Sequence, residues 1–321
     1  MDFQILLSNL TNPTLLFFGL GIVAAIVKSD LEIPLSSSRF IALYLLFAIG
    51  FKGGQELVHE EFSMEIVWSI VFGLTISAVV PLYTFFLLRK RLDVSNAGAV
   101  AASYGSVSAV TFVAAVTFLE AQGHHFDGHM VAVMALMESP AIIVGVMLLR
   151  YFSDNEPSSD RKKQGIVRHS LTNGSVLMIL GSLLIGVISD AEQAEGIKPF
   201  TNDIFKGFLA IFLLEMGMVT AKRYGAFRKY GAFLTVFGLL IPAINGCLAA
   251  WFTGFITESD GNRLIFAILA ASASYIAVPA AMRIAAPKAD PGLYIPMALG
   301  VTFPFNITIG MPLYFLVVQA T

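Results

Sequence analysis

The chain has 321 residues, of which 56% are hydrophobic and 13% are charged, and its formal net charge is −2. Soluble domains carry about a quarter charged residues, so this balance excludes an ordinary water-soluble globular protein. It gives no support to a nucleic-acid partner. The single cysteine, Cys247, excludes a disulfide or cysteine-metal framework within one chain.

Apolar runs long enough to cross a hydrocarbon layer of about 30 Å recur along the whole sequence. They are continuous rather than alternating, as at residues 66–88, which indicates helices and not barrel strands. The first residues lack the cationic region of a signal peptide, so we expect the first helix to be retained. We predict ten transmembrane helices, at residues 13–27, 40–50, 64–88, 97–119, 129–151, 171–189, 203–221, 231–256, 263–284 and 293–318.

Lys and Arg residues are segregated between the two ends of these predicted helices. Sixteen of the twenty fall in loops that follow odd-numbered helices, whereas the opposite loops are acidic or rich in histidine, as at residues 59–61. By the positive-inside rule, the basic loops face the cytoplasm. We therefore predict a multi-pass protein in the lipid of a bacterial inner membrane, with both termini extracytoplasmic.

The two halves of the sequence resemble each other. Residues 101–108 (AASYGSVS) in the fourth predicted helix match residues 270–277 (AASASYIA) in the ninth. Further matches in the same order are Gly50 with Gly217, and the Met-Ala-Leu and Pro of residues 134–140 with those of residues 297–304.

This repeat makes the unit five helices long, with a first unit at residues 1–152, a cytoplasmic linker at 153–170 and a second unit at 171–321. An odd number of helices forces the second unit to enter the membrane from the opposite side. The predicted fold is therefore an all-α integral membrane bundle of two inverted repeats. That plan recurs in secondary transporters, whose binding site lies where the two copies meet.

The fourth and ninth predicted helices contain clusters of small residues at their centres, with Pro279 in the ninth. Small residues often only allow close helix packing. Their occurrence at equivalent places in inverted repeats favours a second interpretation, in which both helices are discontinuous and their freed backbone groups become ligands. N–H groups at a half-helix start suit an anion, and carbonyl or hydroxyl oxygens suit sodium.

No Lys or Arg lies near the middle of any predicted helix, so an anionic substrate must be balanced by helix N-termini and a co-bound cation. This is the reason to expect sodium as a coupling ion. Glu138, near the centre of the fifth helix, is a candidate to bind sodium or carry a proton. The other residues assigned to the ion site are Ser103, Thr302 and Asn306, whereas Glu215 is expected at the membrane interface.

Histidines gather in the extracytoplasmic loops as His124, His125 and His129, with His59 a candidate addition. Neither their spacing nor their flanks match a zinc-enzyme motif, so the sequence predicts no metal centre and no resident cofactor. Gly-x-Ser-x-Gly and Walker sequences are absent from the chain. We therefore expect neither an enzyme nor an ATP-driven pump.

The sequence resembles the sodium-dependent bicarbonate transporter (SbtA) family over nearly its whole length. The segments that carry the resemblance are AIGFKGG at 48–54, GSVSAVT at 105–111, MESPA at 137–141, MGM at 216–218 and ASAS at 271–274. The resemblance implies a core domain of helices three to five and eight to ten, which moves past a gate domain of helices one, two, six and seven. It also implies a homotrimer and a PII-like regulatory protein as a cytoplasmic partner.

In that family bicarbonate binds near the crossing of two broken helices, with sodium alongside. The resemblance carries this role to Gly105, Ser106, Ser108, Thr111, Ser272 and Ser274. Where bicarbonate-transporting members carry an aspartate after the serine run, this chain has Tyr275, and Ala277-Val278-Pro279 replaces their Ser-Gly-Pro. Two alternatives therefore stay open, namely an organic-anion transporter and a membrane receptor that does not transport.

Overall fold

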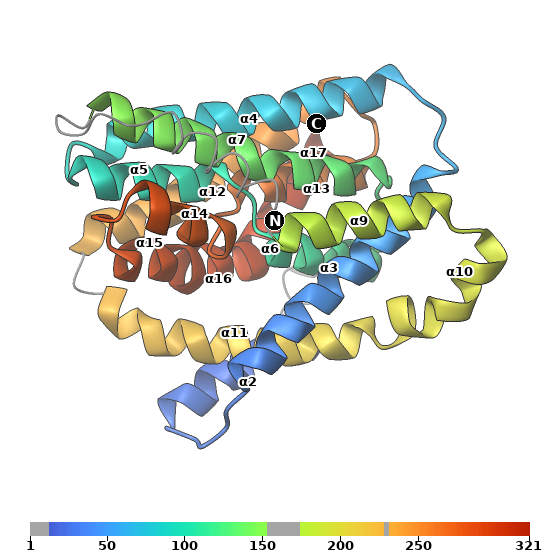
Figure 1. The fold of residues 1–321 in the computed structure, drawn as a ribbon, viewed down its shortest axis with the longest axis horizontal. Coiled ribbons are helices and arrows are strands. Elements are labelled where there is room, and N and C mark those ends of the chain that lie inside the picture. Colours follow the sequence, from blue (N-terminus) through green and yellow to red (C-terminus); the bar gives the residue numbers. More distant parts are fainter. Residues whose placement is uncertain (1–12, 153–173, 228–230) are drawn as a thin grey trace.

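Every regular element is a helix in the residues that the computed structural model describes, which are 13–152, 174–227 and 231–321 (Figure 1). The main helices are α2 (Pro13–Ile26), α3 (Leu35–Leu57), α4 (Met64–Leu88), α5 (Val94–Gly105), α6 (Ala109–Gln122), α7 (His129–Phe152), α9 (Gly174–Ile188), α10 (Ala191–Lys198), α11 (Phe205–Phe227), α12 (Gly231–Phe252), α13 (Asp260–Ala271), α14 (Ala277–Ala285), α15 (Pro291–Met297), α16 (Phe303–Phe305) and α17 (Met311–Ala320). The predicted linker at 153–170 and residues 1–12 lie outside the described residues.

Seven of the described segments are long and apolar enough to cross a membrane, which makes this a multi-pass membrane protein. They are Leu35–Leu57, Met64–Leu88, Val94–Gln122, His129–Phe152, Ala191–Lys222, Gly231–Phe255 and Pro291–Ala320. Two shorter apolar helices, Leu15–Ile26 and Leu177–Ile188, coincide with the first and sixth predicted spans. The predicted span at 263–284 is not among the seven, and it is divided into α13 and α14. The 12 residues of α13 rise only about 18 Å.

Helix α3 is longer than the predicted span at 40–50, since it continues through Gly50, Gly53 and Gly54 to Leu57. Glycine costs about 1 kcal/mol in a helix interior relative to alanine. Here that cost is offset by close packing, because a Cβ on Gly54 would overlap the Leu183 carbonyl oxygen of α9. The glycines that made the span look short are therefore the residues that let two helices touch.

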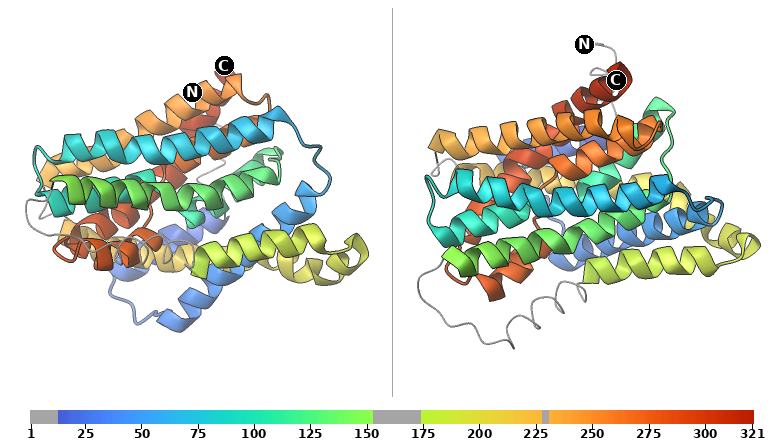
Figure 2. Two further views of the ribbon diagram at one scale, coloured as in Figure 1. Left: turned by 45° about the horizontal axis from the view of Figure 1, so that its top comes forward. Right: turned by 90° about the horizontal axis from the view of Figure 1, so that it is seen from above.

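The helices pack in two groups. In one group α2 lies along α11 and α3 along α9, and in the other α4 packs on α5 and α7 while α12 packs on α13 and α17. Figures 1 and 2 show α4 and α7 side by side in every view, with α11 and α3 on the far side of the bundle from α4. The family resemblance assigns the first group to a gate domain and the second to a core domain, and we call them the gate group and the core group.

The broken helices lie in the middle of the bundle. In an 18-residue apolar stretch of Val94–Gln122, 94% of the residues are buried, whereas the share is 33% in the corresponding stretch of the unbroken Met64–Leu88. A break in a membrane helix leaves backbone groups without helical partners, which is tolerated only where protein or a wet cavity surrounds them. The burial of the broken segment meets this requirement.

The last predicted span is continuous but irregular. Two π-helical turns, Ala298–Thr302 and Asn306–Gly310, interrupt its α-helical hydrogen bonding on either side of Pro304. Proline lacks a backbone N–H, and π-helical turns in membrane and soluble helices are frequent at functional sites. Thr302 ends the first turn and Asn306 begins the second.

Candidate functional site

Two helices are interrupted at the points predicted from the sequence. Helix α5 ends at Gly105 and α6 begins at Ala109, and α13 ends at Ala271 while α14 begins at Ala277. Both breaks start with a serine in extended conformation, Ser106 (ψ 162°) and Ser272 (ψ 165°). The prediction that these two segments are discontinuous is confirmed.

The two breaks are hydrogen-bonded to each other. The Ser274 N–H donates to the Ser103 carbonyl at 2.8 Å, and the Ser103 hydroxyl donates to the Ser274 carbonyl at 2.5 Å. The Ser108 N–H donates to the Ser272 hydroxyl oxygen at 3.0 Å. All four serines are at most 5% exposed. Backbone groups freed by one break are thus satisfied by the other, which fixes the crossing point of the broken helices.

A serine hydroxyl accepts a backbone N–H from the first turn of each second half-helix, and the serine is the N-cap of α6 but lies three residues before the start of α14. The Ser108 hydroxyl oxygen accepts from the Thr111 N–H at 3.2 Å, and the Ser274 hydroxyl oxygen accepts from the Val278 N–H at 3.4 Å. The first N–H groups of a helix lack helical partners and carry partial positive charge. The starts of α6 and α14 therefore form two electropositive ends near one crossing.

A cavity of about 570 Å³ opens onto both of these helix starts. Its wall includes Ala109 and Val110 from α6, and Ile276 and Ala277 from the start of α14. The rest of the wall comes from the two breaks, α3, α7, the first residue of α9, α11 and the last span. This volume is within the range of small-molecule sites, about 300–1,000 Å³.

Of the residues assigned to the substrate, Ser108 and Ser274 line this cavity. Gly105, Ser106, Thr111 and Ser272 are buried and do not line it. Gly105 packs on α4, since a Cβ there would overlap the ring of Pro81. The Ser106 hydroxyl donates to the Glu138 carbonyl at 3.2 Å, so its role in the structure is to tie the break to α7.

The residues assigned to the ion are divided between two places. Glu138 lines the cavity, whereas Thr302 and Asn306 are fully buried in the last span. The Thr302 hydroxyl donates to the Gly238 carbonyl at 2.8 Å and lies 2.7 Å from the Tyr104 hydroxyl. The Asn306 amide donates to the Ala271 carbonyl, the last residue of α13, at 2.8 Å. Ser103 joins the two breaks and is not part of the cavity wall.

Glu215, which was expected at the membrane interface, is a residue of the cavity wall. Its side chain lies in α11 at 9% exposure and lines the cavity, because α11 is packed between α2 and the last span. The signal in the sequence was an acidic residue inside an apolar run, which is a functional candidate at that depth. Tyr275 also lines the cavity, with its ring edge-on to Phe303 at 6.3 Å between centroids. Exposed Arg39 lies in the same wall.

A second, smaller cavity of about 210 Å³ lies at the other end of the same helices. Helix α3 lines the large cavity with residues 35–46 and the small one with residues 48–52, and α6 and α11 are divided in the same way. The small cavity contains Glu120 of α6, which pairs with Lys52 at 3.4 Å and with Lys206 at 3.0 Å. These ion pairs link α6 to α3 and α11 at that end.

A family model described as the Na+-dependent bicarbonate transporter superfamily matches residues 13–319 of the chain. The match includes both broken helices and every residue of the two cavities. No curated protein matches the chain.

Proposed function

Because the chain belongs to the Na+-dependent bicarbonate transporter superfamily, we propose that it is a sodium-coupled secondary transporter of bicarbonate or a similar small anion. Membership makes it a membrane transporter of a small anion and not an enzyme. The observation that carries the proposal is the cavity that reaches the N-terminal turns of both α6 and α14. The membrane we propose is the bacterial inner membrane, with both termini extracytoplasmic.

The proposed fold is ten spans in two inverted repeats, and matching hydrogen bonds support it. Asn96 lies in the first turn of α5, and its side-chain oxygen accepts from the Asp290 N–H, just before α15, at 2.8 Å. Asn262 lies in the first turn of α13, and its side-chain oxygen accepts from the Asp127 N–H, just before α7, at 2.8 Å. Each broken helix therefore holds the start of the last span of the other repeat.

Glycine contacts support the same symmetry. Helices α2 and α11 approach through Gly21 and Gly217, and helices α9 and α3 approach through Gly186 and Gly54. In an inverted repeat α2 corresponds to α9, and α3 corresponds to α11, so the two crossings are equivalent. The counterpart of Gly217 is then Gly54, one helical turn from the Gly50 that the internal sequence match selects.

The structural correspondence between the serines of the two breaks is also shifted relative to the internal sequence match. Ser106 and Ser272 both follow the last residue of a first half-helix, and Ser108 and Ser274 both accept a backbone N–H of the second half-helix. The internal sequence match instead placed Ser103 opposite Ser272. We therefore propose Ser108 and Ser274 as equivalent ligands of the anion, each with a hydroxyl hydrogen to donate.

Sodium in this proposal is held near the same cavity by carboxylates. Where relatives have an aspartate, this chain has Tyr275, but Glu138 and Glu215 both reach the cavity wall. Sodium prefers oxygen ligands, and a carboxylate near the anion is tolerated only with a cation between them. Glu138 and Glu215 are the proposed substitutes for the missing aspartate.

Transport requires the cavity to open alternately on the two sides of the membrane. The large cavity contains Arg39, which the positive-inside rule assigns to the cytoplasmic side. On the opposite side Glu120 pairs with Lys52 and Lys206, which join the core helix α6 to the gate helices α3 and α11. We interpret this conformation as inward-facing, with the Glu120 ion pairs holding the outer side closed.

Two further parts of the proposal follow from the family resemblance. These are a homotrimeric assembly and a PII-like regulatory protein that binds from the cytoplasm. The predicted cytoplasmic linker, residues 153–170, lies outside the described residues. Mass measurement of the detergent-solubilised protein by light scattering tests the trimer.

Uptake of radiolabelled bicarbonate into proteoliposomes tests the proposed function. We expect uptake to require an inward sodium gradient, and Ser108→Ala or Ser274→Ala to weaken the apparent affinity at least about tenfold. A hydrogen bond to a charged group contributes about 1.5–3 kcal/mol, which accounts for that loss. Ser69→Ala is the matched control, because Ser69 is a buried serine of α4 that lines neither cavity. Bicarbonate uptake that ignored both sodium and the two serine changes would refute the proposal.

An organic carboxylate is a second candidate substrate. The cavity is several times larger than bicarbonate needs, and Tyr275 and Phe303 give part of it an aromatic edge. Competition for uptake by a panel of small and organic anions distinguishes the two substrates. Binding without flux would favour the receptor alternative.

A further inference from the structure

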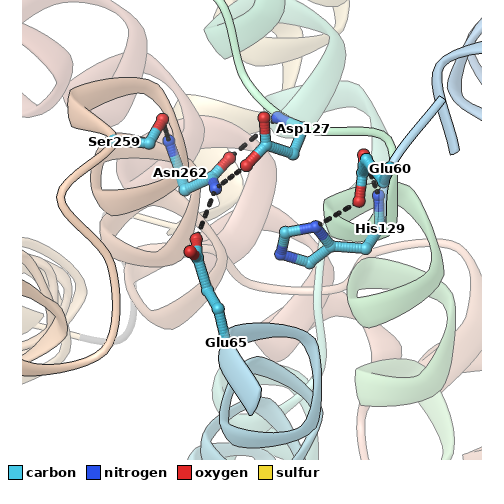
Figure 3. A network of polar contacts seen from close by, with 6 residues as sticks. All are labelled: Glu60, Glu65, Asp127, His129, Ser259 and Asn262. Atoms are coloured by element: carbon cyan, nitrogen blue, oxygen red, sulfur yellow. Dashed lines mark hydrogen bonds and ion pairs between the residues drawn. The ribbon is translucent and has the colours of Figure 1, made fainter. Parts of the chain in front are cut away.

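A cluster of metal-ligating side chains lies at one end of the bundle, apart from both cavities (Figure 3). Glu65 belongs to the first turn of α4, Asp127 precedes α7, and His129 is the first residue of α7. One donor atom from each of these three residues lies within 4.8 Å of the other two. The residues come together only because the starts of α4 and α7 meet.

His129 is prepared to accept a ligand on one ring nitrogen. Its Nδ1 lies 2.8 Å from the Glu60 carboxylate, which also accepts from the His129 backbone N–H at 3.3 Å. A carboxylate accepts hydrogen bonds, so Nδ1 carries the proton and Nε2 presents its lone pair. The residue is only 3% exposed, and Nε2 has no hydrogen-bond partner among the described residues. Figure 3 shows this nitrogen on the side of the ring that faces Glu65.

Asn262 holds the two carboxylates beside each other. Its side-chain N–H₂ donates to Asp127 at 2.6 Å and to Glu65 at 3.2 Å, and it is fully buried in the first turn of α13. Like charges so close repel each other unless a cation lies between them. Within the described ranges no Lys or Arg pairs with Glu60, Glu65 or Asp127.

We propose that His129, Glu65 and Asp127 bind a divalent transition-metal ion, with zinc the best match. One imidazole nitrogen and two carboxylate oxygens are donors that zinc accepts, at distances of about 2.0–2.2 Å, with water as the fourth ligand. Tetrahedral ligands at those distances are about 3.3 Å apart, and the three donor atoms lie within 4.8 Å of one another, so the side chains must close by at most about 1.5 Å. Glu60 supplies the carboxylate–histidine–zinc arrangement that fixes the ring of a ligating histidine.

Of the histidines that gather in the sequence, only His129 belongs to this site, and the two carboxylates beside it were not singled out. His125 is exposed and His124 pairs with Asp260 at 3.7 Å, so neither joins the cluster. The bound ion would join the starts of α4 and α7. Asn262, which lies in α13, would act as a positioning residue for the two carboxylates. All three helices belong to the core group, so the site does not depend on the proposed transport function.

Zinc binding to the purified full-length protein tests the proposal. The affinity tag is removed, the protein is treated with a chelator, and zinc content is measured by mass spectrometry after dialysis against buffered free zinc. Cobalt serves as a spectroscopic probe, because its visible absorption depends on the number and type of its ligands and so reports binding to a four-coordinate site of nitrogen and oxygen donors. The variants are His129→Gln, Glu65→Gln and Glu60→Gln, with His125→Gln as the matched control.

We expect about one zinc ion per chain in the wild type and in His125→Gln, and loss of that ion in His129→Gln and Glu65→Gln. Glu60→Gln should weaken zinc affinity about 10- to 100-fold, the usual effect of removing such a partner. Elution in gel filtration identifies variants that misfold, and Glu65→Gln, which removes a half-buried group, keeps the test valid if His129→Gln misfolds. Zinc content equal in the wild type, His129→Gln and Glu65→Gln would overturn the proposal, as would no bound zinc in the wild type.

Discussion

Replacement of Gly217 by alanine probes the helix crossing on which the gate depends. A Cβ at this position would overlap the Phe18 carbonyl oxygen of α2 and lie 3.0 Å from the Ile22 nitrogen. Both contacts are with backbone, so no side chain can rotate away, and the two helices must separate by about 1 Å to restore ordinary contact. Overpacking of this kind costs about 1–3 kcal/mol.

Gly207→Ala in the same helix is the matched control, because nothing lies within 4 Å of a Cβ there. Alanine is favoured over glycine in a helix by about 1 kcal/mol, so the control should unfold at the same or a higher temperature. Thermal unfolding in detergent, followed by intrinsic fluorescence, should give a midpoint several degrees lower for Gly217→Ala than for Gly207→Ala. One kcal/mol shifts the midpoint about 2–4 °C in domains of 150–250 residues.

The reasoning is wrong if Gly217→Ala is as stable as Gly207→Ala. Inverted symmetry adds a second requirement, since Gly54→Ala should be destabilised by a similar amount. A large loss at Gly217 with none at Gly54 would leave the helix contact intact as an explanation but contradict the equivalence of the two crossings.

Three further predictions concern charged and polar groups. Glu120→Gln removes two partly exposed ion pairs, each contributing up to about 1 kcal/mol. It should therefore speed labelling of a Val116→Cys probe in the small cavity several-fold, whereas Glu195→Gln should leave the labelling rate unchanged. Tyr275→Asp introduces into the cavity wall the carboxylate that bicarbonate-transporting relatives have there, and it should lower the sodium concentration needed for half-maximal uptake. An unchanged sodium dependence would exclude the cavity as the sodium site. Arg263→Leu should lower the thermal unfolding midpoint, because the buried guanidinium donates to the Ala250 and Val318 carbonyls at 3.0 Å. Each carbonyl left unsatisfied costs about 1–3 kcal/mol. Equal midpoints would show that these bonds contribute no net stability.

The sequence by itself determined the class of the protein and the location of its breaks. Apolar runs fix helices because backbone groups in hydrocarbon must pair within their own segment, and the predicted bounds 64–88 are those of α4. Clusters of Ser and Gly lower helix stability locally, so the interruptions fall at residues 106–108 and 272–276 as expected. Both signals are local along the chain, and local signals can be read without knowing the neighbours.

Only the tertiary structure decided which polar residues face the cavity and which are hydrogen-bonded to other parts of the protein away from it. Ser106 and Thr302 look as available as Ser108 in the sequence, but each is bonded to protein away from the cavity, while Glu215 turns out to be part of its wall. The same holds for His129 and Glu65, whose donor atoms meet only where α7 and α4 begin. The direction of a side chain depends on how helices far apart in sequence are rotated against each other, and that rotation is set by contacts such as those at Gly54 and Gly217.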